Sequence, residues 1–193
     1  MKKTDSSAYA YLVLKILLLL CFLSTQVNAG PPANYPIPPD SDIRLFYLQR
    51  STNPNTVVYD ANLLANTKLN ADQPVEIYWL RYNTNGKRRN LNFSERNFAY
   101  GLNFDPIANS DAYSISLMAY SGRGIKVYID PAGKAIAEIK INGKRAQLKR
   151  IYIDVDGSGF WSSVNYIELS GIDLSNNKVI TERFNPNVES DLF

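Results

Sequence analysis

Tight-turn signals recur about every ten residues through much of the chain, and they constrain its fold more than any other feature. Asn142-Gly143 is the strongest, because a type I′ hairpin turn requires positive φ at both central residues, and Asn85-Gly86 marks a further tight reversal. Pro131-Ala132-Gly133 and Asn176-Asn177 mark two further reversals. Turns at this spacing are typical of an antiparallel β-barrel or β-sandwich.

Short runs between the turns alternate as half-buried strands do. Ile151, Ile153 and Val155 share one face of such a run, with Tyr152 and Asp154 on the other. The predicted strands span residues 43–50, 56–64, 75–82, 113–120, 125–129, 135–141, 146–155, 164–174 and 179–184.

The compact domain is predicted to span residues 43–187, with residues 188–193 as a C-terminal tail. Its one predicted helix covers Ser94–Tyr100, where the Ser94 side chain can cap the first turn. The expected fold is all-β: an antiparallel barrel or sandwich of about nine strands with one short helix.

The first 29 residues carry the pattern of an export signal. Lys2 and Lys3 give a positive start, and an uncharged apolar run follows at residues 16–23. The small residues around Ala29 predict cleavage before Gly30. A membrane-spanning helix needs about 20 apolar residues, which favours cleavage over a retained anchor. We therefore expect an exported protein, periplasmic or extracellular, with no membrane span after cleavage.

Residues 30–42 contain five prolines and predict an extended leader in front of the domain. Residues 1–29 hold three basic residues and one acidic residue, so cleavage reduces the chain's 21 basic and 18 acidic residues to 18 and 17. A net charge this small does not favour nucleic acid as a partner.

The chain contains no His, and its single Cys, Cys21, lies within the predicted signal. The commonest general base and the commonest transition-metal ligand are therefore missing. Catalysis would depend on carboxylates, Tyr, Ser, Lys and Arg. A glycosidase, for example, would need two acidic groups about 5–10 Å apart across a cleft. The composition favours a protein without enzymatic activity, and no catalytic residue is predicted.

One segment has the shape of a metal site. Asp154, Asp156 and Ser158 occupy positions 1, 3 and 5 of an EF-hand-like calcium loop, and Gly159 occupies position 6. Position 12 is Asn165 rather than Glu, and no helices are predicted beside the loop. A calcium site and a simple polar turn both remain open, and no other cofactor is predicted.

The most apolar predicted strand, residues 75–82, contains a cation at Arg81. An inward-facing Arg81 would receive the anionic head of a ligand, whereas an outward-facing one would reach solvent along its aliphatic stem. The predicted ligand-binding residues are Arg81, Trp79, Tyr78, Tyr82 and Tyr100. We expect them to line the interior of a closed or nearly closed sheet that holds a small ligand.

Basic residues also gather at 87–89 and at 140–150. Both clusters are consistent with solvated hairpin tips and protected strand edges. An anionic surface or a glycan remains the alternative partner for both.

Several segments resemble the uncharacterised domain of unknown function 4833. They are Ser51–Asn62, Pro74-Val75, Tyr78-Trp79, Tyr82, Ala99-Tyr100-Gly101, Tyr166–Leu169 and Gly171. The likeness extends over about residues 43–186. It implies a compact domain often found behind an export signal, and it implies no activity or substrate.

The favoured function is a binding module for a small apolar or anionic ligand. A structural or interaction protein of the cell envelope, with an exposed apolar patch and an envelope protein as partner, is the alternative. A carboxylate-based hydrolase is a more distant one.

Overall fold

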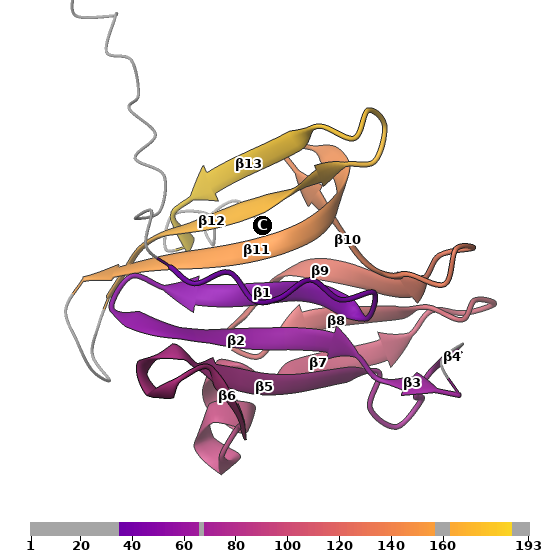
Figure 1. The fold of residues 1–193 in the computed structure, drawn as a ribbon. Coiled ribbons are helices and arrows are strands. Elements are labelled where there is room, and N and C mark those ends of the chain that lie inside the picture. The colour runs from indigo at the N-terminus through magenta and orange to yellow at the C-terminus, as the bar shows by residue number, and fades with distance from the viewer. Residues whose placement is uncertain (1–34, 66–67, 157–162, 187–193) are drawn as a thin grey trace, which may run out of the picture. The chain divides into compact units, whose positions relative to one another are not determined.

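The computed structural model describes residues 35–65, 68–156 and 163–186, which form an all-β domain (Figure 1). Its strands are β1 (Arg44–Arg50), β2 (Asn53–Ala61), β3 (Leu63–Leu64), β4 (Lys68–Leu69), β5 (Val75–Arg81), β6 (Lys87–Asn90), β7 (Leu102–Pro106), β8 (Tyr113–Leu117), β9 (Tyr120–Ile129), β10 (Ala135–Ile141), β11 (Lys144–Asp156), β12 (Ser163–Asp173) and β13 (Val179–Phe184). Two helical segments are the 3-10 turn η1 (Tyr82–Thr84) and the π-helix η2 (Glu95–Ala99). The predicted signal, residues 1–29, lies outside the described residues.

Each of the nine predicted runs coincides with a strand of the structure. The sequence did not indicate β4, β6 or β7, and it merged β3 with β2 in the single run 56–64. β6 is the wholly polar segment Lys87–Asn90, and all but the first residue of β7 are exposed. β6 and β7 are the two end strands of the sheet order. An end strand that buries few side chains does not need alternating apolar residues, so its sequence gives no strand pattern.

β11 pairs with three different strands and thereby joins the parts of the main sheet. The order along this sheet is β6-β5-β2-β1-β11-β10-β9-β8-β7, and β12 pairs with both β11 and β13. Residues 144–147 of β11 pair with β10, residues 150–153 pair with β1, and β12 follows residues 146–156. The β1–β11 pair is parallel. The prediction of a purely antiparallel sheet is therefore wrong at this pair, because β1 and β11 are distant in sequence and no hairpin dictates their direction.

Two predicted hairpin turns are confirmed. Asn85 and Gly86 have φ values of 72° and 73°, and Asn142 and Gly143 have values of 49° and 74°. Asn142 and Gly143 alone separate the paired residues Ile141 and Lys144, as in a type I′ turn. Asn85 and Gly86 end a longer loop that contains η1, between the paired residues Arg81 and Lys87. These turns connect β5 to β6 and β10 to β11.

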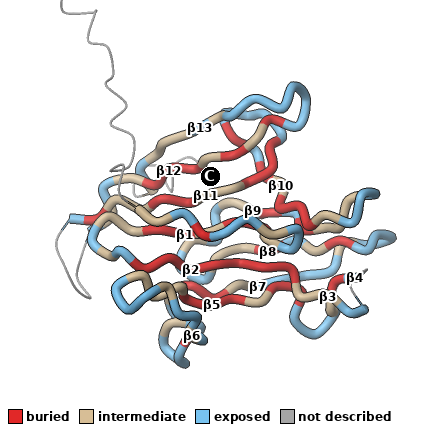
Figure 2. Tube along the Cα trace, in the orientation of Figure 1, coloured by how far each residue is buried: buried red, intermediate tan, exposed pale blue. Residues whose placement is uncertain are grey.

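The sheet curls around an apolar core, and its central strands are buried on both faces (Figure 2). In β2, Val57 and Tyr59 belong to the core on the inner face. On the outer face, Asp60 accepts hydrogen bonds from Tyr78 Oη at 2.7 Å and from Arg44 Nε at 2.5 Å. The buried carboxylate is therefore satisfied by a phenol and a guanidinium, as burial of a charge requires.

Residues 35–41 of the predicted leader contact the outer face of the sheet. The carbonyl of Pro36 accepts a hydrogen bond of 2.9 Å from Gln49 Nε2, and the Tyr35 ring meets Tyr152 edge-to-face at 5.8 Å. The described part of the leader is thus packed against the domain and does not extend freely from it.

An ion pair closes the curl between β9 and β13. Arg123 Nη2 lies 2.7 Å from Glu182 Oε1, and Glu182 Oε2 accepts a hydrogen bond of 2.6 Å from the Asn142 backbone N–H. Burial raises the pKa of Glu182, but the bonds from Arg123 and Asn142 outweigh it and lower the pKa below its ordinary value of 4.5. Glu182 is therefore held as a carboxylate.

We expect Glu182→Gln to lower the free energy of unfolding by about 1–2 kcal/mol at neutral pH, because it weakens a half-buried charged pair. A lowered folded-state pKa contributes stability that is complete above the unfolded-state pKa and is lost as the pH falls through the folded-state value. The difference between wild type and variant in urea titrations should therefore vanish in acid.

The matched control is Glu76→Gln, because Glu76 pairs with Arg88 on the exposed surface. Its cost should stay below about 1 kcal/mol. Equal costs for the two variants would contradict a closing role for Glu182.

Candidate functional site

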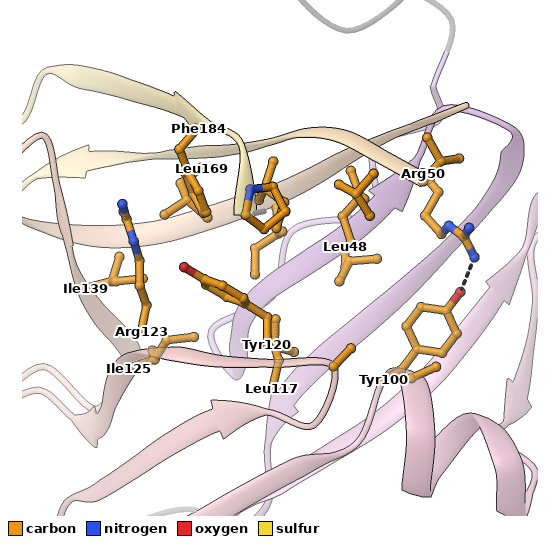
Figure 3. A pocket seen from close by; sticks show the side chains of 18 of the residues that line it. Leu48, Arg50, Tyr100, Leu117, Tyr120, Arg123, Ile125, Ile139, Leu169 and Phe184 are labelled. Carbon is orange, nitrogen blue, oxygen red and sulfur yellow. Dashed lines mark hydrogen bonds between the residues drawn. The ribbon is translucent and has the colours of Figure 1, made fainter. Parts of the chain in front are cut away.

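A cavity of about 600 Å³ lies inside the curl of the sheet (Figure 3). Its lining is Leu48, Arg50, Phe98, Ala99, Tyr100, Leu117, Ala119, Tyr120, Arg123, Ile125, Ile139, Ile151, Ile153, Val155, Val164, Ile167, Leu169, Phe184 and Pro186. Most of these side chains are aliphatic, so the cavity offers an apolar interior.

The inward-facing side chains of alternating strands form this lining. Ile151, Ile153 and Val155, which the sequence placed on one face of a strand, all line the cavity from β11. Tyr152, between them, meets Tyr35 on the opposite face. The face predicted for this strand is therefore confirmed, and it is the face that points into the cavity.

Two arginines lie at opposite sides of the cavity, as Figure 3 shows. Arg50 Nη1 donates a hydrogen bond of 3.4 Å to Tyr100 Oη. Arg123 pairs with Glu182, and its guanidinium lies 4.2 Å from the centre of the Phe184 ring. The charge at Arg123 is thus balanced by a carboxylate, and Arg50 is bonded to a tyrosine of the cavity wall.

The π-helix η2 forms one wall of the cavity through Phe98 and Ala99, followed by Tyr100. The predicted capping by Ser94 is wrong, because its side chain makes no cap hydrogen bond. Asn92 does this instead: its Oδ1 accepts from the Glu95 backbone N–H at 2.8 Å, and Glu95 Oε2 accepts from the Asn92 N–H at 2.8 Å. This is the reciprocal bonding of a capping box, displaced two residues toward the N-terminus.

Glu95 also ties η2 to β6. Its Oε1 lies 2.5 Å from Arg89 Nη2. Burial raises the pKa of Glu95, but hydrogen bonds from the Asn92 N–H and from Arg89 outweigh it, so the pKa lies below the ordinary value of 4.5. η2 is therefore fixed to the end of the sheet by an ionised carboxylate.

The five predicted ligand-binding residues occupy different places, and only Tyr100 lines the cavity. Trp79 lies behind it, with its ring edge-to-face to Tyr100 at 4.9 Å. Tyr78 is on the opposite face of β5, where burial and then its bond to Asp60 raise its pKa to about 12. Arg81 and Tyr82 lie where β5 meets η1, and Arg81 Nε donates to Asn83 Oδ1 at 3.4 Å.

The arginines of the cavity were not among the predicted residues. Arg50 was accessible to sequence reasoning, because it continues the inward alternation of Phe46 and Leu48 along β1. Arg123 gave no such signal, because it lies between two glycines in an unpatterned segment.

The backbone after η2 is anchored from two directions. Tyr59 Oη donates a buried hydrogen bond of 2.9 Å to the Tyr100 carbonyl. A Cβ at Gly101 would lie 1.7 Å from the Arg96 carbonyl oxygen, so only glycine permits this close approach. Tyr100 is therefore held in the cavity wall by the main chain as well as by its ring.

A family model for the domain of unknown function DUF4833 matches residues 46–183. The chain belongs to this family. No curated protein and no solved structure matches it. The resemblance seen in the sequence is confirmed, and the cavity of this DUF4833 chain lies almost wholly within the matched residues.

The proposed calcium loop of this DUF4833 chain lies only partly within the described residues. Asp154 and Asp156 are in β11, and Asp154 Oδ2 accepts a hydrogen bond of 3.0 Å from Asn165 Nδ2 across to β12. Ser158 lies outside the described residues. Within residues 35–65, 68–156 and 163–186, no group of three or more His, Cys, Asp or Glu is arranged to hold a metal ion. The calcium site stays a prediction.

We expect Tyr59→Phe to lower the free energy of unfolding by about 1–2 kcal/mol, because it leaves the buried Tyr100 carbonyl without its donor. Burial raises the pKa of the Tyr59 phenol well above 10.0, so in wild type it should ionise only on unfolding. Urea titrations compare Tyr59→Phe with the control Tyr128→Phe, which removes a part-buried bond of 3.2 Å to Glu138 far from η2 in sequence. An unchanged midpoint for Tyr59→Phe would show that this bond does not anchor η2.

Proposed function

We propose that this protein is an exported binding module for a small amphiphile with an apolar body and an anionic head. The observation that supports it is the aliphatic cavity of about 600 Å³ with Arg50 in its wall. Small-molecule sites commonly occupy about 300–1,000 Å³ and combine an apolar lining with a few polar groups. In this proposal the curled sheet acts as the wall of an open barrel.

Arg50 is the residue that we assign to the anionic head. A guanidinium can bind a carboxylate or a phosphate through two parallel N–H donors. Arg123, at the opposite side of the cavity, contacts Glu182 and the Phe184 ring and is assigned to the wall. The Tyr100 hydroxyl, 3.4 Å from Arg50, supplies a second polar group at the same place.

A carboxylate hydrolase receives less support. The described residues that line the cavity include no Asp or Glu. Glu138 and Glu182 both line a second, more open hollow. Bonds from Arg145 keep the pKa of Glu138 low, and those from Arg123 and Asn142 do so for Glu182 despite its burial. Neither carboxylate is thus prepared to act as a general acid near neutral pH.

The first test is native mass spectrometry of residues 30–193, purified from an export host without denaturation. We expect a discrete adduct that disappears when the protein unfolds, and its mass would give the ligand class. As a control, the protein refolded from denaturant and then offered a long-chain fatty acid should recover an adduct of one molecule. An unadducted mass in both preparations would contradict the proposal.

The second test separates the head from the body of the ligand. Arg50→Gln should weaken binding of a fluorescent fatty acid by roughly tenfold to a hundredfold, since a charged hydrogen bond contributes about 1.5–3 kcal/mol. Displacement by the matching fatty alcohol should change little, because the alcohol carries no charge. Fluorescence titration of both competitors measures the difference.

Arg81→Gln is the matched control, because Arg81 lies outside the cavity lining. It should bind the fatty acid as wild type does. If Arg81→Gln weakened fatty-acid binding and Arg50→Gln did not, the anionic head would have to bind near β5, and the assignment of Arg50 to the head would be wrong.

A further inference from the structure

One segment of the chain combines a net positive charge with exposed aromatic rings. Residues 81–100, here named the basic aromatic segment, contain five basic residues and one acidic residue. The rest of the chain contains 16 basic and 17 acidic residues, so its net charge is −1 against +4 for the segment. A local positive field of this kind attracts anionic surfaces even when the whole protein is nearly neutral.

The same segment exposes two large aromatic rings. Phe93 is 76% exposed and Phe98 is 73% exposed, and their centres lie 6.5 Å apart. Two further exposed apolar side chains, Phe104 and Met118, line the hollow on the other side of η2. Four of the nine large apolar side chains that are exposed among the described residues therefore lie in or beside η2.

Strand pairing brings cations to this apolar group. Arg89 pairs with Trp79 and contacts Glu95 of η2, and Lys87 pairs with Arg81 on the same face of the two strands. Arg96 is an exposed residue of η2 itself. Arg88 points the other way, where it pairs with Glu76. Lys87 and Arg81 thus lie on the face of β5 and β6 that carries Arg89, the residue that contacts η2, and Arg96 lies on η2 itself.

The basic aromatic segment also forms the rim of the cavity. Phe98 is both exposed and part of the cavity lining, and Tyr100 continues the wall inward. An amphiphile that leaves a lipid surface would meet this rim first.

We infer that the basic aromatic segment docks the protein on an anionic lipid bilayer. Phe93 and Phe98 enter the interfacial layer, and Lys87, Arg81 and Arg96 contact the anionic headgroups, as in peripheral membrane elements. The contact is peripheral, and no helix within the described residues is long and apolar enough to span a membrane. This inference goes beyond the proposed function and holds whether or not the cavity contains a ligand.

The test is co-sedimentation of residues 30–193 with vesicles of phosphatidylcholine that contain about a quarter phosphatidylglycerol. We expect binding to these vesicles, little binding to pure phosphatidylcholine, and release by salt. Each cation removed should weaken binding about fivefold, since a basic residue near such a surface contributes about 1 kcal/mol. Lys87→Gln with Arg96→Gln should therefore lose far more than Lys140→Gln with Lys178→Gln, which changes the net charge equally.

Phe93→Ser tests the aromatic contribution, because Phe93 is exposed but does not line the cavity. It should weaken vesicle binding about tenfold while leaving fatty-acid binding in solution unchanged. Val179→Ser, at a site of 73% exposure on β13, is the control and should bind vesicles as wild type does.

Several results would overturn the docking inference. These are equal binding to neutral and anionic vesicles, equal losses in the two double variants, or no vesicle binding at all. A wild-type dimer in solution that Phe93→Ser converts to a monomer, without vesicle binding, would assign the segment to self-association. If the protein bound anionic vesicles but no fatty acid, the proposed function would be contradicted and the docking inference would still hold.

Discussion

The pairing of β11 with three strands is the constraint on which the rest of the domain depends. One edge of this long strand receives β10 and then β1, while β12 follows the other edge. β1, the first strand, therefore pairs with β11 directly, and β13, the last strand, is joined to it through β12. Its inner residues Ile151, Ile153 and Val155 are also part of the cavity wall, so the strand that organises the sheet also shapes the site.

The two faces of the sheet use similar residue types for different purposes. On the outer face, Tyr78 and Arg44 satisfy the buried carboxylate of Asp60. On the inner face, Arg50 and Tyr100 meet inside an apolar cavity. A tyrosine or an arginine in a strand is therefore informative about function only when its face is known. On one face of this sheet these residues satisfy a buried carboxylate, and on the other they line the cavity.

The cavity and the basic aromatic segment are physically continuous, and together they suggest how the protein would work. An anionic amphiphile resides in a bilayer whose surface attracts the cations beside η2, and Phe98 lies at the point where that surface and the cavity lining meet. The capping bonds of Asn92 and Glu95 keep η2 in place at this rim. The same exposed rings also favour the alternative of an envelope interaction protein, because a partner protein would bind to exposed apolar surface.

The sequence by itself determined the all-β class, the nine main strands, two hairpins and the family, because alternation and Asn-Gly turns are local and each strand reports its own faces. It also named Tyr100, which lies in the cavity wall, and it put Ile151 and Ile153 on one face. Only the tertiary structure decided that β1 joins β11 in parallel, that Arg50 and not Arg81 reaches the cavity, and that Asn92 caps η2. These outcomes depend on which distant strands pair. Alternation along one strand identifies its two faces but not the strand that it pairs with.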